Sequence, residues 1–165
     1  MVEVRSPQAQ RVQDALASLG LDLRVVELPG STRTAEEAAR AIGCAVGQIV
    51  KSLVFRVVAT DRALLVAASG VNRVSLDRLA ELAGGSVERA SPDFVRARTG
   101  FAIGGVPPVA HVWRLESFLD EDLFAYPTLW AAAGTPHAVF AVTPQQLQSL
   151  TRGVVVRIKD SPPAG

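Results

Sequence analysis

The stretch "QIVKSLVF", residues 48–55, and the stretch "ALLVAAS", residues 63–69, decide the predicted fold. Both runs are short and apolar, and the turn residues Thr60 and Asp61 lie between them, which is typical of two strands of a β-hairpin. The first strand is expected at about residues 50–58. Directly adjacent strands favour an α+β domain over a doubly wound parallel sheet, in which helices separate the strands.

Lys51 is unusual in this hairpin. Because side chains alternate along a strand, it shares one face with Ile49 and Leu53. The chain has 17 cationic residues, yet only Lys51 and Lys159 are lysines. Two structural explanations are open: a stem that lies on apolar surface while its head reaches water, or a charge that protects an edge strand. The third explanation is a functional lysine, and position alone does not choose among them.

The rest of the chain supplies further elements around the hairpin. Helices are expected where Ser-Pro, Thr-Pro or capping-box residues precede an apolar stripe, and glycines mark most of their ends. These helices run from Ser6-Pro7 to Gly20, from Thr34 to about Ile42, from Ser75 to Ala83, from Ser91-Pro92 to Gly100, and from Thr143-Pro144 onward. Additional strands are expected at 23–28, 87–90, 111–115, 138–142 and 154–158, with a brief strand in "FAIGGVPP" (101–108). The pattern predicts a mixed, largely antiparallel sheet curled toward a barrel, with peripheral helices.

Composition limits the class of protein. A chain of 165 residues with 48% apolar content suits one packed domain, expected at 1–160 with a loose tail at 161–165. The net charge of +1 gives no general nucleic-acid-binding character, although a small local contact with RNA remains compatible with it. No apolar run approaches the about 20 residues that span a bilayer, so we expect no membrane partner. One cysteine, Cys44, and an N-terminus without a signal-peptide core predict a cytoplasmic protein.

Most catalytic chemistries lack their motifs here. His111, His137 and Cys44 stand alone, without the spacings that place two metal ligands on one face, so no metal site is predicted. The chain has no GxSxG nucleophile elbow, and neither GxxxxGK[ST] nor GxGxxG occurs. The sequence therefore predicts neither a metal nor an organic cofactor.

The segment "TGFAIGGVPPVAH", residues 99–111, is the second candidate feature. Gly104 and Gly105 permit a close backbone approach, and Pro107 and Pro108 fix the chain and carry no N–H. The last main-chain N–H donor of the loop before the prolines is therefore that of Val106, while the main-chain carbonyls stay free to accept hydrogen bonds. Two interpretations remain open: a tight connection between strands, or a rigid backbone grip on a small ligand.

Together these segments resemble the YbaK/ProX family of aminoacyl-tRNA deacylases, free-standing relatives of the editing domain of bacterial prolyl-tRNA synthetases. The similarity spans about residues 32–147, through "TRTAEEAARAIGCAVGQIVKSLVF", "LLVAASGVNRVSLDRLAEL", "ASPDFVRARTGFAIGGVPPVAH" and "AAAGTPHAVFAVTPQQL". The resemblance implies that Lys51 is the essential lysine. It also implies that a GxxxP loop, here Gly104 to Pro108, cradles the aminoacyl group.

One segment departs from the family pattern. Deacylases of the family that act on cysteinyl-tRNA(Pro) have a glycine segment similar to GGKRG followed by an acidic residue, whereas residues 133–139 are "AGTPHAV". The resemblance thus implies the deacylase class without implying cysteine specificity. Further candidate substrate contacts are Gly134, Thr135 and His137 in this segment, with Thr32 and Ser69 near the inferred pocket.

The implied substrate is an ester between a small amino acid and the terminal ribose of tRNA, possibly tRNA(Pro) in this family, so the implied partner is the acceptor end of an aminoacyl-tRNA. An aminoacyl-tRNA synthetase is a further candidate partner. A charged Lys51 would stabilise the developing oxyanion, whereas a neutral Lys51 would act as a base only if burial lowered its pKa by several units. The alternatives are a non-catalytic module that binds an amino acid or an aminoacyl end, and a Schiff-base lysine.

Overall fold

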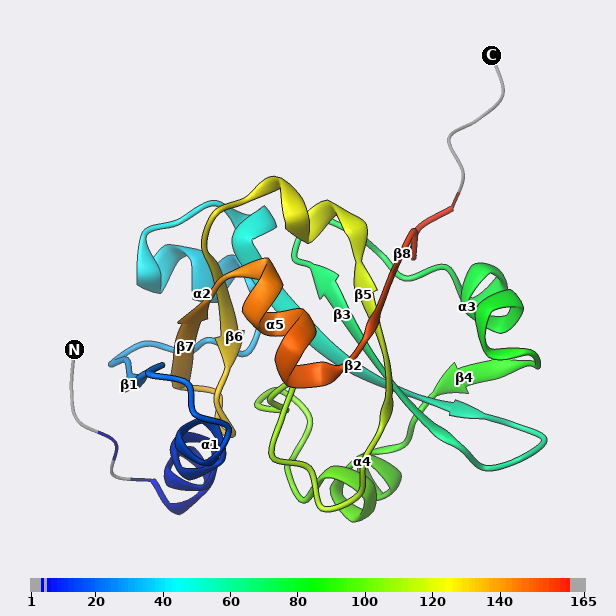
Figure 1. Cartoon of the computed structure of the whole chain (residues 1–165), viewed down its shortest axis with the longest axis horizontal. Coiled ribbons are helices and arrows are strands. Elements are labelled where there is room, and N and C mark those ends of the chain that lie inside the picture. The colour runs from blue at the N-terminus through cyan, green and yellow to red at the C-terminus, as the bar shows by residue number, and fades with distance from the viewer. Residues whose placement is uncertain (1–3, 5, 161–165) are drawn as a thin grey trace.

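The computed structural model describes Val4 and residues 6–160, and the predicted tail at 161–165 lies outside the described residues. One eight-stranded sheet runs through the molecule, with helices on both of its faces (Figure 1). The helices are α1 (Pro7–Ser18), α2 (Ala35–Ile42), α3 (Leu76–Ala83), α4 (Pro92–Thr99) and α5 (Pro144–Thr151), with short 3-10 helices η1 (Val46–Gln48) and η2 (Glu121–Ala125). The strands are β1 (Val25–Glu27), β2 (Ile49–Val57), β3 (Ala63–Ser69), β4 (Val87–Arg89), β5 (Glu116–Asp120), β6 (Leu129–Ala132), β7 (Ala138–Val142) and β8 (Val154–Val156).

The sheet is mixed and largely antiparallel, as predicted. Its strand order is β1-β7-β6-β2-β3-β5-β8, and β4 pairs with β2 outside this path. The β2–β3 hairpin is confirmed, with the register running from Val50 opposite Ser69 to Arg56 opposite Ala63. β6 and β5 extend the hairpin in parallel on its two sides. The sheet does not close into a barrel, because the strand path has ends at β1 and β8.

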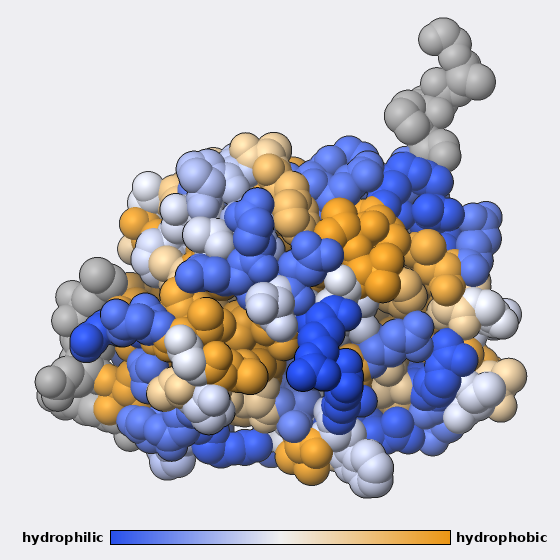
Figure 2. Space-filling view, in the orientation of Figure 1, coloured by the Kyte–Doolittle hydropathy of each residue, from blue (hydrophilic) through white to orange (hydrophobic). Residues whose placement is uncertain are grey.

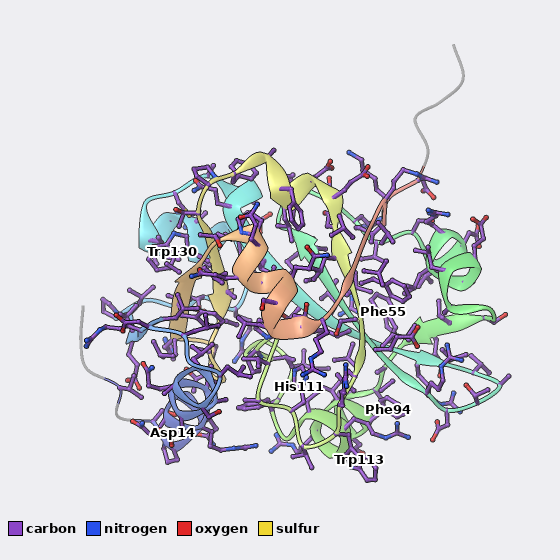
Figure 3. The ribbon with its side chains drawn as sticks, in the orientation of Figure 1. Asp14, Phe55, Phe94, His111, Trp113 and Trp130 are labelled. Carbon is purple, nitrogen blue, oxygen red and sulfur yellow. The ribbon has the colours of Figure 1, made fainter. Side chains whose placement is uncertain are left out.

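The two faces of the sheet are covered by different helices. Val50 and Val54 of β2 belong to the largest hydrophobic cluster, which also contains buried residues of α1, α4 and α5. Phe55, on the alternate face of β2, packs in a second cluster with α3. Ile49, nearer the start of the strand, packs with α2 in a third cluster, and Trp130 lies against the same cluster (Figure 3). Lys51 therefore lies on the α2–α3 face, between two hydrophobic clusters.

The predicted helix starts are confirmed at the level of individual caps. The side chain of each N-cap residue accepts a hydrogen bond from a main-chain N–H in the first turn, which satisfies a donor that the helix leaves free. These N-caps are Ser6, Thr34, Ser75, Ser91 and Thr143. Three helices end at a glycine in the left-handed conformation, namely Gly43, Gly84 and Gly100.

Two strand predictions were wrong. Residues 101–108 and 111–115 form no strand; β5 begins only at Glu116, and β6 had no predicted counterpart. The first segment is broken by Gly104, whose φ is +95°, and by prolines that cannot donate to a sheet. In the second, the N–H groups of Val112 and Trp113 donate to the last carbonyls of α4 instead of to a strand. The segment 111–115 thus caps a helix.

The surface is of mixed polarity. Figure 2 shows hydrophilic and hydrophobic side chains interspersed on one face, with a hydrophobic patch over β8, where Val154 and Val155 are exposed. Within the described part of the chain, no helix is long and apolar enough to cross a membrane.

Candidate active site

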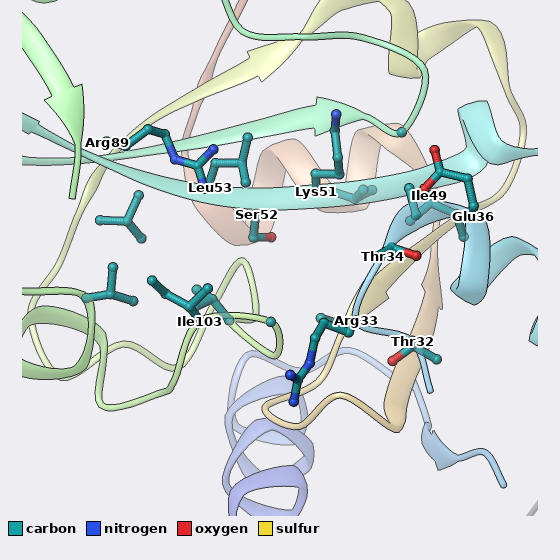
Figure 4. A pocket seen from close by; sticks show the side chains of 18 of the residues that line it. Thr32, Arg33, Thr34, Glu36, Ile49, Lys51, Ser52, Leu53, Arg89 and Ile103 are labelled. Atoms are coloured by element: carbon teal, nitrogen blue, oxygen red, sulfur yellow. The ribbon is translucent and has the colours of Figure 1, made fainter. Parts of the chain in front are cut away.

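A cavity of about 430 Å³ opens along β2 (Figure 4). Its walls come from β2, from the segment that leads into α2, from the start of α4 and from the loop after α4. Small-molecule sites commonly have a volume of about 300–1,000 Å³, so the cavity is large enough for a small ligand. The lining residues are Thr32, Arg33, Thr34, Ala35, Glu36, Ile49, Val50, Lys51, Ser52, Leu53, Val54, Gly70, Arg89, Ala90, Val95, Ile103, Gly104, Val106 and Ala132.

Lys51 is half-buried in this cavity, and its Nζ donates a hydrogen bond to the main-chain carbonyl of Asn72. Burial lowers the pKa of the Lys51 ammonium, and nearby Arg89 adds to this effect, while the negative charge of Glu36 opposes it. β3 pairs with β2 along one side, and β6 and β4 pair with the two ends of its other side. The lysine is thus held by a specific acceptor at a cavity wall.

Asn72 is itself held by two carboxylates. Its side-chain amide donates to Asp120 Oδ2 at 2.8 Å and to Asp122 Oδ2 at 2.7 Å. Asp120 is 1% exposed and also accepts a hydrogen bond from the N–H of Ser69. Lys159 donates to Asp122 at 2.7 Å, which helps to lower the pKa of that carboxyl. The only two lysines of the chain are therefore connected through one hydrogen-bonded network.

The predicted glycine loop reaches the cavity through Gly104 and Val106. Gly105 lies behind them and packs against the main chain of Thr135, where an added Cβ would approach backbone atoms to 2.8 Å. Pro107 and Pro108 are buried but do not line the cavity. The carbonyl of Pro107 is 2.7 Å from Nε2 of His111, whose pKa is lowered by burial. His111, labelled in Figure 3, is partly buried.

The segment at 133–138 forms hydrogen bonds with both loops that line the cavity. Gly134 N–H donates to Gly105 O at 2.9 Å, and Thr32 N–H donates to Pro136 O at 2.6 Å. Nδ1 of His137 is 3.0 Å from Gly30 O, and its side chain is exposed. Gly134, Thr135 and His137 do not line the cavity. Their segment instead joins the loop at Thr32 to the loop at Gly105 through main-chain hydrogen bonds.

Two hydroxyls in the cavity wall have no hydrogen-bond partner among the described residues: Thr32 Oγ1 and Ser52 Oγ. Thr32 was predicted as a contact, whereas Ser52 was missed because strand alternation places it on the face opposite Lys51. Lys51 and Ser52 both line the cavity although they leave opposite faces of β2 (Figure 4). Ser69, also a predicted contact, is fully buried at the end of β3 and donates to Gly47 O at 2.8 Å. It does not line the cavity.

No organised metal-binding group appears in the part of the chain that the structure describes: no three or more His, Cys, Asp or Glu side chains are placed to hold an ion. Cys44 is a free thiol, and burial raises its pKa. The polar groups of the cavity are therefore an ammonium, hydroxyls, main-chain amides and carbonyls, the Glu36 carboxylate and the guanidinium groups of Arg33 and Arg89. Such groups can bind and polarise a small polar ligand.

Residues 30–150 match the aminoacyl-tRNA editing domain. The chain belongs to this family, which confirms the YbaK/ProX resemblance. A crystal structure of a protein proposed to be a trans-editing enzyme for prolyl-tRNA synthetase is 53% identical, with a TM-score of 0.91 over 96% of this chain and all of the other. The hypothetical protein APE2540 is 30% identical, with a TM-score of 0.83 over 90% of this chain and 98% of the other. The uncharacterised protein YwhH of Bacillus subtilis is 32% identical over 77% of this chain and 80% of its own.

Proposed function

We propose that this protein is a trans-editing deacylase, which hydrolyses the ester of a mischarged tRNA that carries a small amino acid. The observation that carries the proposal is that Lys51 and the loop residues Gly104 and Val106 line one cavity. Membership of the editing-domain family supports the reaction class. The similar protein proposed to act for prolyl-tRNA synthetase makes tRNA(Pro) the first substrate to test. We place this activity in the cytoplasm, where charged tRNA is used.

The proposed reaction needs no covalent nucleophile, because the ester is already activated. Water adds to the ester carbonyl, the ribose oxygen leaves, and the products are a free amino acid and uncharged tRNA. Lys51 acts in its charged form. One N–H of its ammonium donates a hydrogen bond to the carbonyl of Asn72, and the other two are free to stabilise the developing oxyanion. A fixed donor in a half-buried site stabilises charge better than solvent does, since it need not reorganise.

The apolar part of the cavity provides the size selection. Val54, Val95 and Val106 line it and belong to the same hydrophobic cluster. A well-packed wall can exclude a side chain that is too large. Synthetases need such a second site, because one methylene in an apolar pocket gives only about 1–3 kcal/mol of discrimination.

The experiment is a deacylation screen with purified protein and a panel of mischarged tRNAs, run with and without a chelator. We expect turnover of at least one small aminoacyl-tRNA at equal rates in both conditions, because the proposed mechanism uses no metal. Loss of turnover with chelator would overturn metal independence. A full panel with no turnover above buffer would favour the alternative, a non-catalytic module that binds the aminoacyl end.

A further inference from the structure

The sheet has a break in its hydrogen bonding at the cavity. On one side of β2, the antiparallel ladder with β3 runs without interruption from Val50 to Arg56. On the other side, β6 pairs only with Ile49 and Val50, and β4 pairs only with residues 55–57. Between these two partners, no strand formed by the described residues lies beside β2.

The hydrogen bonds at the ends of β2 show which residues point toward this break. Gly70 N–H donates to Ile49 O at 2.8 Å and Val57 N–H donates to Arg62 O at 2.9 Å, so odd-numbered residues of β2 bond on the β3 side. Ala90 N–H donates to Val54 O at 3.1 Å, so even-numbered residues bond on the opposite side. Main-chain polar groups alternate in this way along an antiparallel strand. The N–H and C=O of Ser52 therefore point into the break.

Ser52 thus presents three polar groups without a strand or side-chain partner at one place. Its N–H and C=O face the break, and its Oγ has no hydrogen-bond partner among the described residues. Thr32, 7% exposed, adds a second unpartnered hydroxyl to the cavity wall. Buried polar groups are normally paired, since an unpaired one loses its hydrogen bonds to water without replacement. The wall is consequently incomplete without a ligand that has both donors and acceptors.

We propose that the main chain of Ser52 holds the aminoacyl group, with its C=O accepting from the α-ammonium and its N–H donating to the ester carbonyl. This inference rests on the proposed function and names the contacts that position the ester. An α-amino ester has one donor group and one acceptor carbonyl, which match the free pair on Ser52 in the way that an added strand would.

The same placement divides the cavity between the two parts of the substrate. Figure 4 shows Lys51 and Ser52 leaving opposite sides of β2. The amino-acid side chain lies on the Ser52 side, against the apolar wall of Val54 and Val95. The ribose lies on the other side, with Lys51 and Glu36. The ester carbonyl is then at the strand edge, between the two faces.

Amide hydrogen exchange tests this contact directly, with 3'-alanylamino-3'-deoxyadenosine as a non-hydrolysable probe. In the free protein, the Ser52 amide should exchange much faster than the amides of Lys51 and Leu53, which bond to β3. Saturation with the probe should slow the exchange of Ser52 at least tenfold. A Ser52 amide that is already protected in the free protein, or that stays unprotected while Lys51 resonances shift on binding, would overturn the inference.

Proline substitution provides a second test. Ser52→Pro removes the N–H without breaking a ladder bond, so the melting temperature should stay close to that of wild type. Leu53→Pro, the matched control, removes a bond to β3 and should unfold the sheet. Ser52→Ala removes only the hydroxyl, and we expect kcat of Ser52→Pro to lie at least tenfold below that of Ser52→Ala.

The outcomes separate this inference from the proposed function. Equal kcat in Ser52→Pro and Ser52→Ala, with wild-type turnover intact, would overturn the contact and leave the deacylase standing. A wild type without turnover would overturn the function. If Ser52→Pro unfolds and the Ser52 amide of the wild type is protected from exchange, β2 uses this N–H in its ladder and the break is wrong.

Discussion

The ammonium of Lys51 donates to the main-chain carbonyl of Asn72, and the side chain of Asn72 is fixed by the carboxylates of Asp120 and Asp122. The acceptor of the lysine is therefore part of a rigid turn, since Asn72 N–H also donates to Ser69 O at 2.9 Å. A long, flexible side chain becomes a positioned point charge through this contact.

Replacement of Lys51 should affect catalysis more than folding. Lys51→Ala removes the lysine ammonium from the cavity wall, and we expect kcat to fall on the order of 10²- to 10³-fold, as for loss of an oxyanion donor. Lys51→Arg should also lose much of the rate, because a planar guanidinium cannot replace a compact charge at the same acceptor. Single-turnover deacylation and thermal melting check both variants. Near wild-type turnover by Lys51→Arg would contradict the assigned role.

The pH profile should reveal the charge state of Lys51. Burial lowers its pKa below the ordinary value of about 10.4. If the ammonium is the active form, enzyme-catalysed deacylation falls as pH rises through this lowered pKa, and Lys51→Arg lacks this alkaline limb. A rate that rises through the same range would instead indicate a neutral amine acting as base. The depressed pKa also means that the contribution of Lys51 to stability rises with pH between its folded and unfolded values.

Asn72 should act through Lys51. Asn72→Ala leaves the Asp120 carboxylate with one partner fewer, and we expect a stability loss of about 1–3 kcal/mol. The displaced acceptor should lower kcat on the order of ten- to a hundredfold and should also move the alkaline limb of the pH profile. Lys159→Gln is the control, since it removes only the solvent-exposed pair with Asp122 and should leave the melting temperature nearly unchanged. An unchanged pH profile in Asn72→Ala would reduce Asn72 to a structural role.

The loop should tolerate no side chain at Gly105. Gly105→Ala places a Cβ 2.8 Å from the main chain of Thr135, and neither backbone can yield without moving the turn. We expect lower stability and slower deacylation, because Gly104 and Val106 are displaced from the cavity. Gly85→Ala is the matched control: its Cβ would meet Val57 at an ordinary 3.6 Å. Equal melting temperatures of the two variants would contradict the close approach seen at Gly105.

Binding of tRNA should depend weakly on salt. With a net charge of +1, we expect few phosphates to be neutralised, mostly at the acceptor end. Each phosphate contact on a single strand contributes about −0.7 to the slope of log K against log salt concentration. Filter binding at several salt concentrations measures this slope. A slope that corresponds to on the order of six contacts or more would reveal a basic face that the net charge conceals.

The sequence by itself determined the local structure. The caps at Ser6, Thr34 and Ser91 formed as predicted, because a side-chain hydroxyl accepts a hydrogen bond from a main-chain N–H within the same helical turn. The β2–β3 hairpin was also predictable, since its strands are separated by a short turn. Lys51 could be singled out because lysine is rare in this chain and stands in an apolar run.

Tertiary structure alone decided the rest. The pairing of β2 with β6 joins residues about eighty positions apart, and the break that exposes Ser52 depends on where two such pairings stop. No local sequence pattern predicts where these pairings stop. The same holds for Asn72, which meets Lys51 only because the turn after β3 folds back over the strand. Residue type fixed the chemistry available at this site, but long-range strand register fixed which groups remain unpaired, because hydrogen bonds between strands depend on partners that are distant in the chain.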